Sequence, residues 1–171
     1  MKNNKNLDPQ LIINIAAQTL TLYQQQNEIV KYSVSTAKNG IGSQQDSGCT
    51  PLGQHIIAEK IGGSAPISAV FIGRIPTGEI YSESFGALHP ERDWILSRIL
   101  WLSGLEEGVN KGNNDQGSCD TYQRYIYIHG TPDTEPMGLP LSHGCVRMRN
   151  KDIVELFEQV EEGTSVTIVA E

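Results

Sequence analysis

Apolar and polar positions alternate along the first third of the chain. Residues 19–23 and 30–34 place an apolar side chain at every second position, and residues 11–15 form a short apolar run. A period of two is typical of a strand with one buried face. We therefore predict three strands here. A loop rich in Gly, Ser, Asp and Asn follows over residues 37–51.

Further strand patterns occupy the middle of the chain. They lie near residues 54–61, 67–72 and 122–128, and the turn "PTGEI" at 76–80 leads into another short strand. The segment "DWILSRILWLS" at 93–103 differs, because its apolar residues recur at helical spacing between Asp93, which can cap a helix, and Gly104. This pattern predicts a helix over residues 93–103.

The end of the chain predicts a second helix and a closing strand. Asn150 can cap a helix whose apolar stripe is formed by Ile153, Leu156, Phe157 and Val160. Gly163 ends this pattern, and residues 166–169 form a strand. The 171 residues predict a single domain over 1–171, mostly β with two helices.

Composition excludes several classes of partner. The net charge is −7, and no block of Lys or Arg occurs, so neither nucleic acid nor an anionic membrane is expected as a partner. No stretch approaches the roughly 20 apolar residues of a membrane span. We interpret "LIINIAA" at 11–17 as part of the first strand, not as the core of a signal peptide, so no export signal is predicted.

The three cysteines do not form a disulfide framework. Cys49, Cys119 and Cys145 are odd in number, and no pair has the C-x-x-C spacing of a zinc ribbon. A disulfide between Cys49 and Cys119 would require an oxidising compartment. Without it, both are incidental thiols, and we expect His55 and His89 to be surface or loop histidines.

The segment "YIYIHG" at 125–130 places a histidine at the end of a strand. Alternate side chains of a strand share a face, so His129 shares one with Tyr125 and Tyr127, while Ile126 and Ile128 face the core. The three tyrosines at 122, 125 and 127 either line a groove or pack across strands.

The segment "SHGCVR" at 142–147 places a cysteine after a glycine. Gly144 lets a substrate approach the backbone, and N–H groups near Cys145 can stabilise an oxyanion. His129 or His143 can act as the base that a thiol nucleophile needs, and Arg147 adds positive potential. Chemistry alone leaves three interpretations of the cysteine: a reactive thiol, a metal ligand or a buried core residue.

These motifs resemble those of a known enzyme family. "IHGT" at 128–131 together with "SHGCVRMRN" at 142–150 is similar to the signature of the YkuD-type L,D-transpeptidases. "TPLG" at 50–53 and "VSTAKNG" at 34–40 resemble further family segments, with Ala37 in place of the usual glycine, and residues 152–169 resemble the closing helix and strand. The resemblance implies a β-sandwich or open barrel. The chain departs from the family pattern at about 85–120, where a segment longer than the family's hairpin contains the predicted helix.

The resemblance also implies roles for individual residues. Cys145 would be the nucleophile, His129 its base, and Gly130 the residue whose carbonyl orients the histidine. Oxyanion and substrate-binding roles would fall to Ser142, His143, Gly144, Arg147 and Tyr127. We interpret Asn150 as a helix cap, not a catalyst. The inserted segment is either a lid over the site or a packed element with Trp94 and Trp101 in the core.

The implied reaction takes place on peptidoglycan stem peptides. The cysteine attacks the carbonyl that joins a diamino acid to D-Ala, D-Ala leaves, and the thioester passes to an amine, or to water in an L,D-carboxypeptidase. No metal or cofactor is implied, and carbapenems are expected to acylate the thiol. The family acts in the periplasm or cell envelope, whereas a natural chain without an export signal would be cytoplasmic.

Two other functions compete with this one. In the first, His129, His143 and Cys145 are zinc ligands of a binding module. In the second, the chain is a wall-binding protein that has lost turnover.

Overall fold

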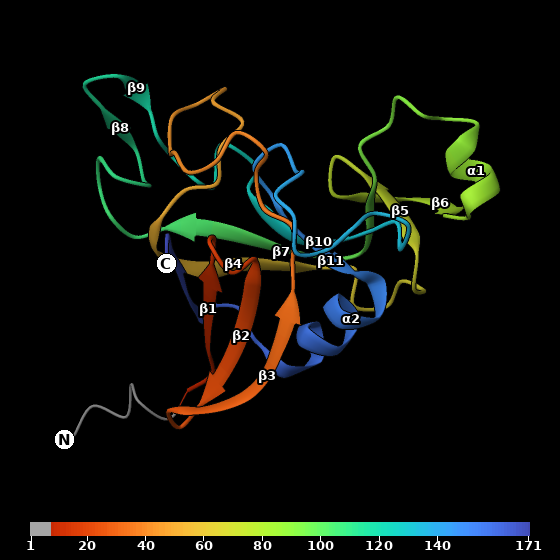
Figure 1. Cartoon of the computed structure of the whole chain (residues 1–171), viewed down its shortest axis with the longest axis horizontal. Helices are drawn as coiled ribbons and strands as arrows, with labels where there is room; N and C mark the ends of the chain where they lie inside the picture. Colours follow the sequence, from red (N-terminus) through yellow and green to blue (C-terminus); the bar gives the residue numbers. More distant parts are fainter. Residues whose placement is uncertain (1–7) are drawn as a thin grey trace.

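One large curled sheet dominates the chain (Figure 1), which we describe from a computed structural model over residues 8–171. Its ten strands include a continuous path in the order β11-β10-β7-β4-β12-β1-β2-β3. The strands of this path are β1 (Gln10–Asn14), β2 (Thr19–Gln24), β3 (Asn27–Ser33), β4 (Gly53–Ile61), β7 (Ile95–Gly104), β10 (Tyr127–Thr131), β11 (Val146–Arg149) and β12 (Ser165–Val169). The mostly-β prediction is therefore confirmed.

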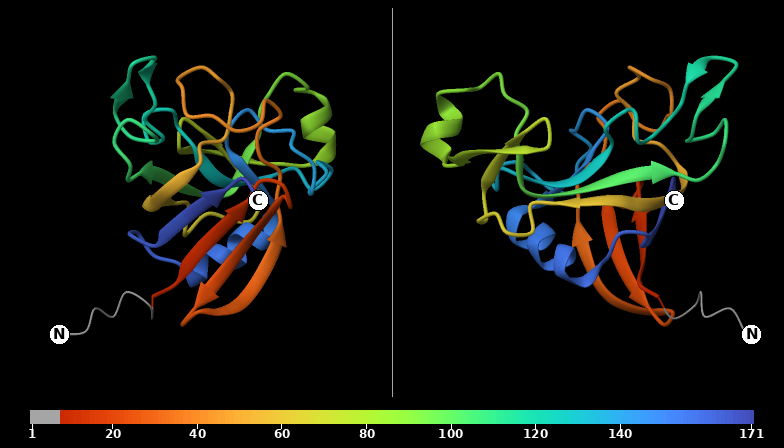
Figure 2. Two further views of the ribbon diagram at one scale, coloured as in Figure 1. Left: turned by 60° about the vertical axis from the view of Figure 1, so that its left-hand side comes forward. Right: turned by 180° about the vertical axis from the view of Figure 1, so that it is seen from behind.

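Two small hairpins extend from this sheet. The first consists of β5 (Ala69–Ile72) and β6 (Ile75–Ile80) and branches from β7 through β5. The second is a separate two-stranded sheet of β8 (Asn113–Asn114) and β9 (Gly117–Ser118). The two hairpins lie at opposite ends of the molecule, as the view from behind also shows (Figure 2).

The predicted helix over residues 93–103 is wrong, because this segment is strand β7. Leu100 and Leu102 face the main core, whereas Ile99 and Trp101 face a second apolar cluster beneath β5. A strand buried on both faces is apolar at nearly every position, so its sequence also satisfies a helical period. The helix of this region is instead α1 (Glu83–Ala87), capped by Ser82.

The C-terminal helix was predicted correctly. Helix α2 (Asn150–Gln159) buries Ile153, Leu156 and Phe157 against β7, β10 and β11. The expected cap is wrong, because Asn150 is the first helical residue and its side chain makes no cap bond. It is buried, accepts a hydrogen bond from Ser97 Oγ at 2.6 Å and donates to Thr131 O at 2.9 Å. Asn150 therefore joins the helix to β7 and β10.

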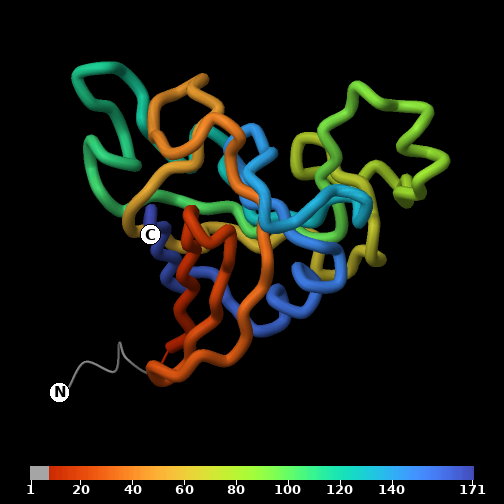
Figure 3. The backbone as a smooth tube through the Cα atoms, viewed as in Figure 1, coloured from red at the N-terminus to blue at the C-terminus, as the bar shows by residue number. Residues whose placement is uncertain are grey.

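The predicted strand over 122–128 begins later than expected, at Tyr127. Residues 121–125 form turns, and Tyr125 is exposed with a φ of 57°. Loops from distant parts of the sequence gather at this end of β10, as the backbone tube shows (Figure 3). Isolated bridges join Ser35 to Arg147 and Ala37 to Ser142.

No helix in the described part of the chain is long and apolar enough to cross a membrane.

Candidate active site

Cys145 lies at the start of β11, beside β10. The two strands are parallel, with Ile128 paired to Val146, so the cysteine lies level with Tyr127. Its Sγ accepts a hydrogen bond from the N–H of Tyr127 at 3.3 Å and donates to the carbonyl of Tyr125 at 3.3 Å. Desolvation raises the pKa of the Cys145 thiol to about 12, against the opposing effect of the Tyr127 N–H. The resting residue is therefore a thiol, and nucleophilic chemistry needs a base.

His129 follows on the same face of β10 as Tyr127, as its sequence predicted. The ring is buried, and Nδ1 lies 2.6 Å from the carbonyl oxygen of Gly130. That contact requires the proton on Nδ1 and leaves Nε2 as a basic atom, which has no hydrogen-bond partner within residues 8–171. Burial lowers the pKa of His129, which keeps the imidazole neutral.

Gly130 is a glycine for a steric reason. A Cβ at this position would lie 2.5 Å from the carbonyl oxygen of Leu96 and 2.6 Å from Asn150 Oδ1. Neither neighbour can move without breaking a sheet or helix contact. The absence of a side chain therefore lets β10 approach β7 and α2 closely enough to hold His129.

The loop before Cys145 is fixed by hydroxyl groups. Ser142 Oγ donates to the carbonyl of Cys145 at 2.5 Å and accepts from the N–H of Gly144 at 3.2 Å. Thr50 Oγ1 donates to the carbonyl of Gly144 at 2.9 Å. Gly144 has a φ of 133°, which side-chain-bearing residues rarely adopt. Its N–H is thus already bound, whereas no partner within the described residues accepts from the N–H of Cys145.

Asp93 connects two of the predicted site residues. Its carboxylate contacts His143 Nδ1 at 3.0 Å and Arg147 Nη2 at 3.1 Å. Burial opposes ionisation, but the hydrogen bond from His143 and the charge of Arg147 hold the pKa of Asp93 below its usual value. The Arg147 side chain is largely buried, whereas that of His143 is 75% exposed.

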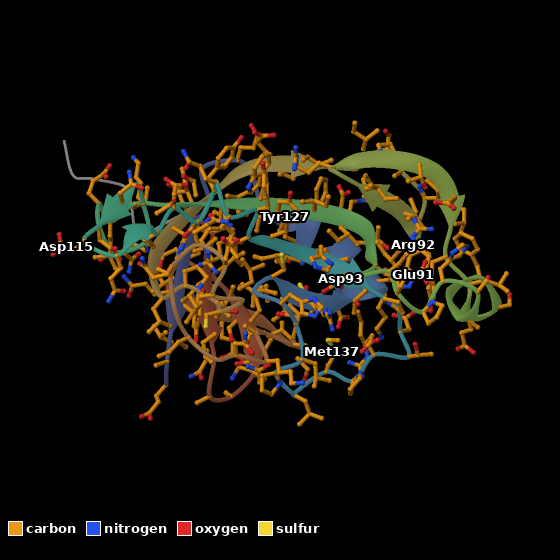
Figure 4. All side chains as sticks on the ribbon, turned by 90° about the horizontal axis from the view of Figure 1, so that it is seen from above. Glu91, Arg92, Asp93, Asp115, Tyr127 and Met137 are labelled. Atoms are coloured by element: carbon orange, nitrogen blue, oxygen red, sulfur yellow. The ribbon has the colours of Figure 1, made fainter. Side chains whose placement is uncertain are left out.

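A small polar pocket of about 170 Å³ lies beside this ion pair. Asp93 and Arg92 line it, together with Glu91, Glu135, His143 and Arg147. Figure 4 labels Asp93, with Glu91 and Arg92 further along the segment that comes from α1. Part of the inserted segment thus forms one wall of the site.

Tyr127 joins the site to a group of aromatic side chains. It is buried in the second apolar cluster, against which Cys145 also packs, and its hydroxyl accepts a hydrogen bond from Arg74 Nη1 at 3.0 Å. Trp94 and Trp101 are buried, as the packed interpretation of this region required.

Two expectations about other polar residues need correction. His55 is not on the surface: it is fully buried in β4, its Nδ1 contacts the carbonyl of Gly53 at 3.0 Å, and its Nε2 contacts Thr121 Oγ1 at 3.0 Å. The zinc interpretation is not supported either, because no group of three His, Cys, Asp or Glu side chains in residues 8–171 is arranged to hold a metal ion. Cys49 and Cys119 are free thiols.

Sequence reasoning missed residues that position the site from a distance. Thr50 and Thr36 hold the loop before the cysteine, the latter by accepting from the N–H of Ser142 at 2.9 Å. Arg124 donates to the carbonyl of Cys49 at 2.8 Å. Thr36 lies in "VSTAKNG" and Thr50 in "TPLG", and the resemblance of these two segments to the family was the signal that could have identified them. Nothing local in the sequence indicates the role of Asp93.

Comparison with known proteins identifies the class. The family model for the YkuD L,D-transpeptidase catalytic domain matches residues 8–168, and the chain belongs to this family. Solved structures share the fold. An L,D-transpeptidase from Mycobacterium smegmatis superposes with a TM-score of 0.55 at 17% identity over 95% of this chain and 59% of that one. Bdellovibrio bacteriovorus Bd1075 superposes with a TM-score of 0.59 at 16% identity over 96% and 48%.

Curated relatives match over a shorter stretch. The probable L,D-transpeptidase YbiS of Escherichia coli K12 is 47% identical over 60 residues, which are 34% of this chain and 20% of YbiS. The putative L,D-transpeptidase YkuD of Bacillus subtilis is 38% identical over 65 residues, or 35% and 40% of the two chains. The match therefore spans less than half of each relative.

Proposed function

We propose that the chain is a peptidoglycan L,D-transpeptidase with Cys145 as its nucleophile. The observation that carries this proposal is the contrast between the two nitrogens of His129. Nδ1 contacts the carbonyl oxygen of Gly130, while Nε2 has no hydrogen-bond partner in the described chain. The His129 ring lies on the face of β10 that adjoins Cys145. A buried, neutral imidazole held in this way is suited to general-base catalysis.

The chemistry proceeds through a thioester. His129 Nε2 takes the thiol proton as Cys145 Sγ attacks the carbonyl carbon that joins the diamino acid to D-Ala. The N–H of Cys145 is available to stabilise the resulting oxyanion. The C–N bond then breaks, and D-Ala leaves as an amine with the proton from His129. A second amine then attacks the thioester carbonyl and gives a proton to His129. The C–S bond breaks as the new amide forms, and the leaving sulfur takes the proton from His129 to restore the thiol.

The raised pKa of Cys145 fits this order of events. A thiol with a pKa of about 12 is protonated at neutral pH, so proton transfer accompanies the attack. Asp93 holds Arg147 beside the strand, where its charge can orient a substrate carboxylate. Because stem peptides belong to the cell wall, we expect the protein to act in the cell envelope.

Known ligands of related structures suggest the test. LdtMt1 has been solved with imipenem, and L,D-transpeptidase 3 of Mycobacterium tuberculosis with a faropenem-derived adduct. We expect intact-mass measurement after incubation with imipenem to show one covalent adduct in the native protein and none in Cys145→Ala. A native protein without an adduct would contradict the proposal.

Products then separate transfer from hydrolysis. A tetrapeptide donor with an amine acceptor gives a cross-linked product in a transpeptidase. The same donor gives only the tripeptide if water takes the acyl group, as in an L,D-carboxypeptidase.

A further inference from the structure

A cluster of aromatic rings adjoins Cys145. Tyr122 stacks on Trp101 with centroids 3.9 Å apart, and Tyr127 meets the same ring edge-on at 5.6 Å. Tyr125 is tilted toward it at 5.8 Å. We call these four residues the aromatic wall. Cys145 packs against the cluster that contains Trp101 and Tyr127, and its Sγ also bonds to the backbone of Tyr125 and Tyr127.

The side chain of Arg74 covers this wall. Its guanidinium carbon lies 4.6 Å from the ring centre of Trp101 and 5.0 Å from that of Tyr125, and Nη1 donates to the hydroxyl of Tyr127. Within residues 8–171 Arg74 forms no ion pair with a carboxylate. The guanidinium is therefore held here by aromatic faces and a phenol, without direct contact with a carboxylate.

The backbone conformation of Arg74 does not favour an arginine, so the contacts of its side chain explain better why an arginine occupies this turn. Gly73 and Arg74 form a two-residue turn between β5 and β6, with φ of 55° and 68°. Such turns favour Gly, Asn or Asp at both positions, because a positive φ crowds other side chains. An arginine here brings a guanidinium onto the wall despite an unfavourable conformation.

One acidic group lies at the edge of the wall. Tyr122 donates its hydroxyl hydrogen to Glu59 Oε1 at 2.5 Å. This carboxylate adds negative potential beside the ring faces. The wall therefore has both features that favour an ammonium ligand, namely electron-rich faces and a nearby anion.

We propose that the aromatic wall is an ammonium-binding subsite beside Cys145, and that Arg74 occupies it in the free protein until the ammonium group of a diamino acid displaces it. This inference rests on the proposed function, which requires a diamino acid next to the bond that is cut. The ammonium group can come from the donor side chain or from the acceptor amine. Arg74 then competes with substrate instead of binding it.

Equilibrium binding to the Cys145→Ala protein tests this competition without turnover. The ligand is a tetrapeptide stem with a diamino acid before D-Ala, either with a free side-chain ammonium or with that group acetylated. Arg74→Ala should tighten binding of the free form by about three- to tenfold, the range expected for a cation–π contact, and leave the acetylated form unchanged. Tyr125→Leu, which changes an exposed ring, should weaken binding of the free form only.

Two further variants control for charge and folding. Arg74→Lys keeps a cation on the turn and should bind the free form much as the parent does. Lys31→Ala removes an exposed cation that pairs with Glu28 on β3 and should not alter either affinity. Weaker binding of both peptides by Arg74→Ala would overturn the proposal and make Arg74 a ligand for a substrate anion.

A second experiment, with an acceptor amine present, distinguishes the donor side chain from the acceptor amine as the source of the ammonium group. If the acceptor occupies the wall, Arg74→Ala in the native Cys145 background raises the ratio of cross-linked to hydrolysed product about three- to tenfold. Donor affinity then stays unchanged. If Arg74→Ala changes neither the donor affinity nor this product ratio, the aromatic wall is not an ammonium-binding subsite. A native protein that imipenem does not acylate refutes the proposed function, while binding of donor and acceptor peptides to Cys145→Ala still decides the subsite.

Discussion

Two buried histidines, His55 and His129, each bond a backbone carbonyl through Nδ1, but they differ in the hydrogen bonding of Nε2. Nδ1 of His55 and Nδ1 of His129 each contact a backbone carbonyl, at 3.0 Å and 2.6 Å. Nε2 of His55 also contacts Thr121 Oγ1, whereas Nε2 of His129 has no partner in the described residues. Burial lowers the pKa of both rings. Low basicity therefore does not distinguish the two rings, whereas the hydrogen bonding of Nε2 does, and the proposed base is the ring whose Nε2 has no partner in residues 8–171.

The largest expected effect comes from removing the proposed general base. His129→Gln should slow acylation of Cys145 by imipenem roughly 10²- to 10⁴-fold, the usual contribution of a general base. Time-resolved intact mass measures this rate. His55→Gln is the matched control, and equal losses in the two variants would refute the distinction between them.

Acid should destabilise the fold through these same rings. His55 has a pKa of about 4 when folded and an ordinary value of 6.5 when unfolded, so the unfolded chain binds more protons between these limits. Stability is then complete above pH 6.5 and falls toward pH 4, by about 3 kcal/mol from His55 alone. Urea titrations across this range measure the slope, and His55→Leu should flatten it. An unchanged slope in that variant would show that His55 is not responsible.

At constant neutral pH, His55→Leu should lower the free energy of unfolding by about 1–3 kcal/mol, because the buried hydroxyl of Thr121 and the carbonyl of Gly53 lose a partner. Chemical denaturation measures this loss. The fraction that remains folded should still be acylated at the native rate. Slower acylation of that fraction would contradict a purely structural role.

A smaller effect is expected from the ion pair beside His129. Asp93→Asn should slow acylation on the order of fivefold to tenfold, because Arg147 is left largely buried with a weaker partner. Glu91→Gln is the control, since this nearby carboxylate lies 3.6 Å from His89 Nδ1, is largely exposed, and forms no ion pair with Arg147 within residues 8–171. If both variants behave alike, the charge of the segment matters more than the Asp93 contacts.

The sequence predicted local features better than distant contacts. The strand around Leu20 and Leu22 and the stripe of α2 were predicted correctly, because the buried apolar side chains of each recur at the period of its own element. Strand β7 was mistaken for a helix, since both of its faces are buried.

The site shows the same division. His129 and Cys145 were predicted as base and nucleophile from their own short motifs; the structure places His129 on β10 and Cys145 directly before the neighbouring strand β11. Asp93 was interpreted as a helix cap and His55 as a surface residue, because their partners lie 50 and 66 residues away. A single sequence contains no signal for such pairings.

The position of β12 determines when the two parts of the large sheet can be joined during synthesis. This strand lies between β4 and β1, although the ribosome makes it after both of them. Before β12 is made, no strand joins β1 to β4. Strands β1–β3 and the bridges from Ser35 and Ala37 to the cysteine loop then lack this connection to the remainder of the sheet. On the ribosome, the loop that contains Cys145 is therefore made before the strand that joins β1 to β4.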